Sequence, residues 1–216
     1  MKEYKLPIGC DVPETIILAD GDFPSHPLAL EWLRQCPYVV CCDGAANTYI
    51  RSGRMPEAIV GDGDSLLPDI KERYASLIHS EAEQETNDLS KAFRFCLSQE
   101  RKRITIMGAT GKREDHTIGN VSLLADYMEQ AEVSMMTDYG IFVPIREDSM
   151  FESYIGQQIS VFNMNSTALS AEGLAYPLSV FTNWWQGTLN EALARHFIIR
   201  TEGKVLVFRV GIFSKC

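Results

Sequence analysis

Two aspartates alternate with two glycines in residues 61–65, whose sequence is Gly-Asp-Gly-Asp-Ser. They follow a short apolar run, residues 58–60. In an extended segment the side chains of Asp62 and Asp64 point to the same side. Paired carboxylates suit Mg²⁺, which keeps several waters and takes further ligands from substrate phosphates. The alternative is an acidic turn after a strand, because Gly and Asp are common turn residues.

A second polar group, residues 84–88, reads Gln-Glu-Thr-Asn-Asp and precedes an amphipathic segment. Apolar residues recur every three or four positions through residues 86–99, which predicts a helix. Thr86 or Asn87 can cap this helix. An acid in the first helical turn is stabilised by the helix dipole, so Asp88 taken alone is explained by helix stabilisation.

Residues 108–116 combine two glycines with Lys112, Arg113, Asp115 and His116. Asp115 can cap the helix that follows, and backbone N–H groups at a helix start bind anions. Arg113 can hold a phosphate through two parallel hydrogen bonds. The spacing is not that of a Walker A loop. For His116, an exposed position at the helix start is favoured over a catalytic role.

Aromatic side chains gather in residues 173–178 and 183–191. They can stack on a flat ring, and the Asn190 amide can bind the edge of a heterocycle. The alternative is that Tyr176, Trp184 and Trp185 belong to a sandwich core or a dimer interface. We prefer this alternative for the two tryptophans.

The elements that position these groups alternate between strand and helix in the first part of the chain. Strands are predicted at residues 15–19, 38–42, 58–60, 104–107 and 132–137, and helices at residues 25–36, 45–52, 69–78, 86–99 and 118–128. This order predicts a mostly parallel, Rossmann-like sheet with helices on both faces. Such sheets bind ligands at the carboxyl ends of their strands, where Asp43, Asp62, Asp64 and the loop 108–116 lie.

The pattern changes after about residue 139. Short β-like runs occupy residues 141–143, 150–154, 158–164, 168–171, 196–201 and 205–210, and only residues 191–195 look helical. The sequence therefore predicts an α/β fold in two parts, an N-terminal α/β sandwich over residues 1–139 and a C-terminal antiparallel β-sandwich over residues 140–216.

The composition and net charge limit the classes of ligand that the protein can bind. The 216 residues are 45% hydrophobic and carry a net charge of −9, with a pI near 5.0. This charge argues against nucleic-acid binding, so an anionic substrate needs local Lys and Arg or a bridging cation. The six cysteines form no C-x-x-C pair, and neither a signal segment nor a membrane-spanning stretch is expected. A reduced, cytoplasmic protein is the simplest interpretation.

Five motifs in this order resemble the thiamine pyrophosphokinase family. They lie at residues 42–47, 61–65, 84–92, 108–120 and 187–191, and the likeness covers residues 15–210. The resemblance implies an ATP-dependent diphosphotransferase that makes thiamine diphosphate and AMP from ATP and thiamine. It also implies a nucleotide-binding catalytic domain over residues 1–139, a thiamine-binding domain over residues 140–216, and a homodimer whose subunits share the site.

The resemblance also assigns roles to residues. Catalysis falls to Asp62, Asp64, Asp88 and Arg113, and the first three are matched as Mg²⁺ ligands. The matched nucleotide-binding residues are Asp43, Gly108, Thr110, Lys112, Arg113, Asp115 and His116. Those matched to thiamine are Gln84, Asn87, Thr188 and Asn190. Whether Asp88 holds the metal or accepts the alcohol proton stays open.

The chain departs from the family pattern at four positions. Glu85 stands where Asp is usual, and Ala46 and Ala109 stand where Gly is common. Leu189 replaces a Ser before Asn190, which removes one expected hydrogen bond to substrate, and Thr188 is the alternative donor.

Two other functions are alternatives to the thiamine pyrophosphokinase activity that the resemblance implies. One is a diphosphokinase that acts on another hydroxymethyl heterocycle, such as a pterin. The other is a sensor that binds a nucleotide or thiamine diphosphate without turnover. Three converging carboxylates near a phosphate disfavour the sensor, because binding alone does not require them.

Overall fold

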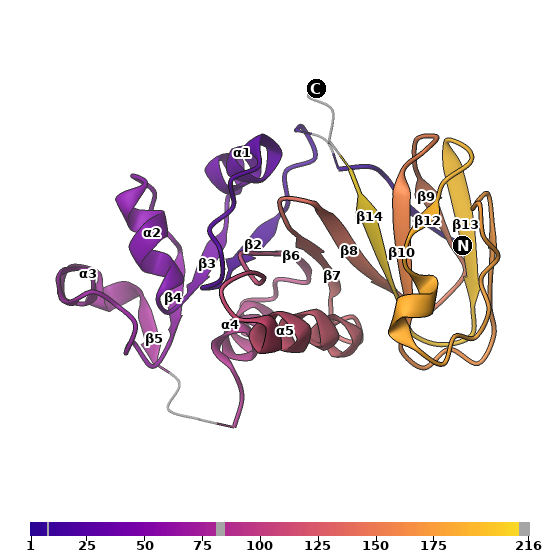
Figure 1. The fold of residues 1–216 in the computed structure, drawn as a ribbon. Helices are drawn as coiled ribbons and strands as arrows, with labels where there is room; N and C mark the ends of the chain where they lie inside the picture. The colour runs from indigo at the N-terminus through magenta and orange to yellow at the C-terminus, as the bar shows by residue number, and fades with distance from the viewer. Residues whose placement is uncertain (8, 81–84, 212–216) are drawn as a thin grey trace.

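The computed structural model describes residues 1–7, 9–80 and 85–211. A ten-stranded sheet runs through both halves of the chain (Figure 1). Its first six strands are parallel, in the order β7-β6-β2-β3-β4-β5. They are β2 (Thr15–Leu18), β3 (Val39–Cys42), β4 (Ala58–Gly61), β5 (Ile78–Ser80), β6 (Arg103–Met107) and β7 (Glu132–Met136).

Helices cover both faces of this parallel part. On one face lie α1 (Pro27–Gln35), α2 (Ala45–Arg51) and α3 (Pro68–Arg73), and on the other lie α4 (Asp88–Ser98) and α5 (Glu114–Tyr127) (Figure 1). Trp32 and Tyr49 fill the first core, while Phe93 and Tyr127 stack at 3.9 Å in the second. The predicted α/β fold is confirmed. None of the described helices is long and apolar enough to cross a membrane.

The C-terminal half extends the sheet and adds a second one. Strands β8 (Gly140–Ile145), β14 (Val205–Val210), β10 (Gln158–Asn163) and β12 (Asn190–Glu191) continue the large sheet with antiparallel pairing. The second sheet has the order β1-β9-β13-β11, made of β1 (Lys2–Tyr4), β9 (Ser149–Glu152), β13 (His196–Thr201) and β11 (Leu169–Glu172). An apolar core including Phe151 and Val207 lies between the sheets, which confirms the C-terminal β-sandwich.

The first residues of the chain belong to this second sheet. Strand β1 pairs in parallel with β9. The buried guanidinium of Arg209, on β14, donates to the carbonyl oxygens of Tyr4, Lys5 and Glu152 at 3.3, 2.9 and 2.9 Å. A division at residue 139 stays a prediction, and the large sheet is continuous across that position.

Three predicted helices differ from the structure. Residues 69–78 are helical only to residue 73, and a 3₁₀ turn then leads into the edge strand β5. Residues 191–195 are not helical. A short 3₁₀ helix, η2 (Trp184–Gly187), lies just before them, and β12 occupies their start. Helix α5 begins four residues earlier than predicted, inside the polar loop, where no apolar periodicity marks it.

Candidate functional site

A cavity of about 620 Å³ lies where β2, β3, β4 and β6 end. Side chains of both charges line it. The acids are Asp20, Asp62 and Asp88, and the bases are Lys91, Lys112 and Arg113. The strands are parallel, so their carboxyl ends meet at one edge of the sheet and bring together groups distant in sequence.

Asp43 lies directly after β3 and is only 4% exposed. Its Oδ2 accepts a hydrogen bond from the backbone N–H of Ser65 at 3.1 Å, while its buried Oδ1 has no partner among the described residues. Burial, reinforced by the neighbouring Asp88 and Asp62, raises the pKa of Asp43 above its ordinary value. The site thus contains a buried carboxylate oxygen that lacks a donor.

The acidic stretch after β4 forms a turn. Gly63 has φ +77°, and the Asp62 carboxylate accepts the backbone N–H of Asp64 at 3.0 Å, which lowers the pKa of Asp62. The segment therefore has the turn given above as the alternative, not the extended geometry in which both side chains point to one side. Asp62 lines the 620 Å³ cavity, whereas Asp64 lines a neighbouring hollow beside Lys71.

The start of α4 supplies the third acid. Asn87 caps this helix, because its Oδ1 accepts the backbone N–H of Ser90 at 2.9 Å. Asp88 follows in the first turn and pairs with the buried Lys91 at 3.1 Å. A lysine held this far from solvent fixes the position of the Asp88 carboxylate at the cavity wall.

The loop between β6 and α5 supplies two positively charged residues of the cavity lining, Lys112 and Arg113. Lys112, with φ +57°, donates to Asp20 Oδ1 at 3.0 Å and to the Asp20 carbonyl at 2.9 Å. Arg113 is the N-cap residue of α5 and binds Asp115 through two hydrogen bonds, of 2.6 and 3.0 Å. This pairing lowers the pKa of Asp115 to about 2. The prediction that Asp115 caps α5 is wrong, because its carboxylate pairs with Arg113 instead.

The cavity gathers part of the predicted site. Its lining includes Asp62, Asn87, Asp88, Lys112, Arg113 and His116. The predicted residues absent from the lining are Asp43, Asp64, Gly108, Thr110, Asp115, Thr188 and Asn190, and Gln84 lies outside the described residues. Sequence reasoning missed Asp20, although it follows β2 as Asp43 follows β3.

Asn190 and Thr188 lie in the β-sandwich half. The buried amide of Asn190 bonds to both backbone groups of Tyr176, at 3.0 and 2.8 Å, and so holds that loop. Thr188 Oγ1 donates to the Trp185 carbonyl at 2.7 Å. Trp185 is 72% exposed, and Tyr176 and Trp184 are also exposed. A place in the sandwich core is therefore wrong for these aromatics, and the interface alternative stays a prediction.

The donor set fits a hard divalent cation. Asp43, Asp62 and Asp88 offer carboxylate oxygens, and one buried oxygen of Asp43 has no donor. Mg²⁺ prefers such oxygens and completes its shell with water and phosphate. Within the described residues, no group of three or more His, Cys, Asp or Glu side chains is already close enough to hold a metal ion. The remaining ligands would have to come from solvent or substrate.

Fold and site together define a class of protein. An α/β sheet joined to a β-sandwich presents carboxylates and bases at its strand ends, as suits an anionic ligand bridged by a cation. Residues 29–136 match the family model described as "Thiamin pyrophosphokinase, catalytic domain", and residues 140–208 match "Thiamin pyrophosphokinase, substrate-binding domain". The chain belongs to the thiamin pyrophosphokinase family.

Individual relatives agree with this assignment. Thiamine pyrophosphokinase 1 of Oryza sativa subsp. japonica is 30% identical, over 48% of this chain and 49% of that protein. The chain spans about half the length, or less, of the curated relatives it matches. Among solved structures, thiamin pyrophosphokinase from Candida albicans has a TM-score of 0.78 at 18% identity, covering 97% of this chain and 92% of that one. The enzyme from Bacillus subtilis has a TM-score of 0.76 at 21% identity, covering 91% and 98%. These two solved structures have the same fold as this chain.

Proposed function

We propose that the protein transfers the diphosphoryl group of ATP to the hydroxyl of thiamine, giving thiamine diphosphate and AMP. The observation that carries this proposal is the cavity at the strand ends, where three acids face three bases in a chain of this family. The hydroxyl oxygen attacks the β-phosphorus, and the bond from that phosphorus to the α-phosphate oxygen breaks. The alcohol proton passes to a base, and AMP leaves.

The acids have two tasks in this reaction. Asp62 and Asp88, with Asp43 beneath them, would hold Mg²⁺, and the sequence adds Asp64 to this set. When bound, the ion neutralises charge on the phosphate oxygens. Asp88 is also the candidate acceptor for the alcohol proton, because it lies at the cavity wall with its position fixed by Lys91.

The bases orient the phosphate chain. Lys112 and Arg113 lie on the loop that opens α5, where backbone N–H groups also face an anion. Their present partners, Asp20 and Asp115, are exposed carboxylates. A phosphate can replace them at little cost, because exposed ion pairs contribute little stability. Positioning and charge stabilisation supply most of the catalysis in phosphoryl transfer.

The acceptor would bind where two subunits meet. Tyr176, Trp185 and Leu189 are largely exposed on the β-sandwich half, and exposed aromatic groups of this kind mark interaction surfaces. A cytoplasmic homodimer with a shared site is part of the proposal, and the residues matched to thiamine are Gln84, Asn87, Thr188 and Asn190. Sedimentation at low concentration tests it, since a fully active monomer contradicts a shared site.

The decisive experiment follows the nucleotide product. The purified protein is incubated with ATP, Mg²⁺ and thiamine, beside a reaction with a pterin alcohol and one without acceptor. Thiamine-dependent AMP is expected from the wild type and from Asp126→Asn, an exposed control on α5. Asp62→Asn should lose about 10²–10³-fold in rate. ADP, AMP formed only with the pterin, or no product at all would each overturn the proposal.

A further inference from the structure

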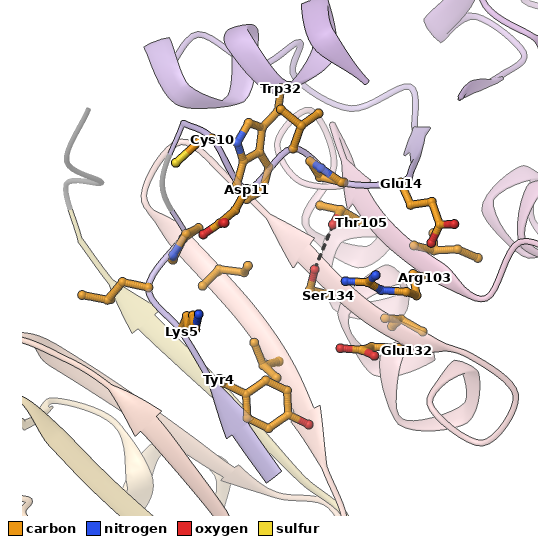
Figure 2. Close-up of a pocket in the computed structure, with 18 of the residues that line it drawn as sticks. Tyr4, Lys5, Cys10, Asp11, Glu14, Trp32, Arg103, Thr105, Glu132 and Ser134 are labelled. Atoms are coloured by element: carbon orange, nitrogen blue, oxygen red, sulfur yellow. Dashed lines mark hydrogen bonds between the residues drawn. The ribbon is translucent and has the colours of Figure 1, made fainter. Parts of the chain in front are cut away.

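A second cavity within the described residues lies away from the acidic one. It measures about 850 Å³ and shares no residue with the acidic cavity. Its floor is formed by the amino-terminal ends of β6 and β7, and its roof by the first residues of the chain and by Trp32 of α1 (Figure 2). It therefore opens at the opposite end of the strands from the proposed active site.

Four polar side chains form a stripe across this floor. Arg103 pairs in register with Glu132, and two residues further along the same strands Thr105 pairs with Ser134. Side chains two residues apart on a strand share a face, so all four point to the same side of the sheet. Arg103 and Glu132 are exposed at the starts of their strands, whereas Thr105 is buried and Ser134 is half-buried. Parallel strands covered on both faces are normally apolar, so the hydroxyl pair departs from what the fold alone requires.

The stripe has unused hydrogen-bonding capacity. The hydroxyls of Thr105 and Ser134 lie 3.2 Å apart and bond to each other, which leaves one O–H donor and further lone pairs directed elsewhere. Arg103 makes no ion pair or side-chain hydrogen bond within the part of the chain that the structure describes. Glu132 contacts Lys2 at 3.6 Å. Figure 2 shows the two pairs side by side, facing the same hollow.

Arg209 also lines this cavity. The Nε–H of Arg209, a residue only 2% exposed, has no acceptor among the described residues. Apolar and aromatic groups such as Trp32, Tyr4 and Val143 complete the walls. Flat apolar walls with a few fixed polar groups are typical of sites for planar small molecules.

We propose that this cavity binds a planar nitrogen heterocycle of the nucleobase type, through an edge that carries an N–H donor beside a ring-nitrogen or carbonyl acceptor. Glu132 accepts from the donor, Arg103 donates to the acceptor, and the hydroxyl pair bonds the next atom inward. A phosphorylated ligand is disfavoured, because the acids in the lining outnumber the bases; the acids are Glu3, Asp11, Glu14 and Glu132, and the bases are Lys5, Arg103 and Arg209.

Binding of free bases to the full chain tests this proposal. Adenine, guanine and cytosine, which lack phosphates, are measured by equilibrium dialysis against the wild type, Glu132→Gln, Thr105→Val and Asp62→Asn. At least one base should bind the wild type and Asp62→Asn equally. Glu132→Gln exchanges a charged acceptor for a neutral one, and Thr105→Val removes a hydroxyl, so each should weaken binding about tenfold.

The results for these variants distinguish binding in this cavity from binding in the acidic cavity. Absence of binding by all three bases overturns the proposal, as does binding that Asp62→Asn weakens and Glu132→Gln leaves unchanged. Glu132 is exposed, so Glu132→Gln should keep the wild-type melting temperature and remains informative even if Thr105→Val unfolds. The readout is binding, and its result does not depend on diphosphoryl transfer.

Discussion

Replacing Asp43 by Asn should make the protein more stable and inactive at the same time. The buried Oδ1 of Asp43 has no hydrogen-bond partner within the described part of the chain, and the carboxylates of Asp62 and Asp88 add repulsion. Asn keeps an oxygen for the Ser65 N–H and turns an amide N–H₂ toward the neighbouring acids. Asn also tolerates the backbone of this residue, whose φ is +27°.

The contacts of Asp43 set the expected sizes of the changes in stability and in rate. A buried polar atom left without a hydrogen bond costs about 1–3 kcal/mol. The free energy of unfolding of metal-free Asp43→Asn should therefore rise by about that amount, which for a chain of this length raises Tm by at least about 2 °C. The rate should fall about 10²–10³-fold, as expected when a charge near the transferred phosphates is lost.

The stabilisation depends on pH in a defined direction. Folding raises the pKa of Asp43, so between the ordinary carboxyl value and the raised value the native state binds more protons than the unfolded state. The free-energy contribution of Asp43 to folding becomes less favourable as pH rises through this window. Asn does not titrate, so the advantage of the variant grows through the window and is constant above it.

Urea unfolding in a chelating buffer, at several pH values, measures this difference directly. Asp62→Asn is the matched control, since Asp62 is exposed and its replacement should change stability by no more than about 0.5 kcal/mol while also lowering activity. An Asp43→Asn protein that is less stable than the wild type near neutral pH would refute the reasoning. Activity close to wild type would remove Asp43 from the site.

Three further changes probe other features. Arg113→Ala should lower kcat/KM for ATP about 10²-fold, with a urea midpoint close to that of wild type because its ion pair with Asp115 is exposed; unchanged kinetics contradict a phosphate contact. Arg209→Met should cost about 3 kcal/mol or more in urea, because it leaves three backbone carbonyls without a donor; wild-type stability would show that these bonds contribute nothing. Leu189→Asn should raise Tm slightly, since Leu189 has φ +60° and is exposed; a lower Tm contradicts strain there.

The sequence predicts those elements whose stability depends on local pattern. Helix α4 is found within one or two residues of its predicted ends, because its apolar face repeats and Asn87 caps it. Strand β1 is not predicted, because three charged or polar positions in a row carry no strand signal and its pairing with β9 joins residues nearly 150 positions apart. The edge strand β5 has a single apolar residue, Ile78, and is missed for the same reason.

The candidate site shows the same contrast between features that the local sequence pattern predicts and features that depend on contacts between distant residues. Acids that follow strands converge because the strands are parallel, which is why Asp20 and Asp62 line one cavity, and Asp88 joins them from the first turn of α4. The turn at Gly63 separates Asp64 from Asp62, and this depends on a backbone angle that the spacing of two aspartates does not reveal. The Asp20–Lys112 pair spans 92 residues, so only the sheet order brings it together.

The continuity of the sheet leads to a last prediction, about how the two halves unfold. Strands β7 and β8 pair across the predicted boundary, with Met135 opposite Phe142, and β1 returns the chain start to the second sheet. Removing either half would expose a sheet edge, and removing the first half would also take away two of the three carbonyl acceptors of Arg209, those of Tyr4 and Lys5. Both losses are costly. We therefore expect one cooperative transition in urea, although two family models match separate parts of the chain.

Each half of the chain contains tryptophan, so fluorescence can test whether the two halves unfold together. Trp32 lies on α1, while Trp184 and Trp185 lie on η2. A double variant, Trp184→Phe with Trp185→Phe, leaves only the first reporter, and Trp32→Phe leaves only the other two. Within each variant, the midpoint from fluorescence should coincide with that from far-ultraviolet circular dichroism, as two-state unfolding requires. Separate midpoints would show that the halves unfold independently and that pairing between β7 and β8 does not couple them.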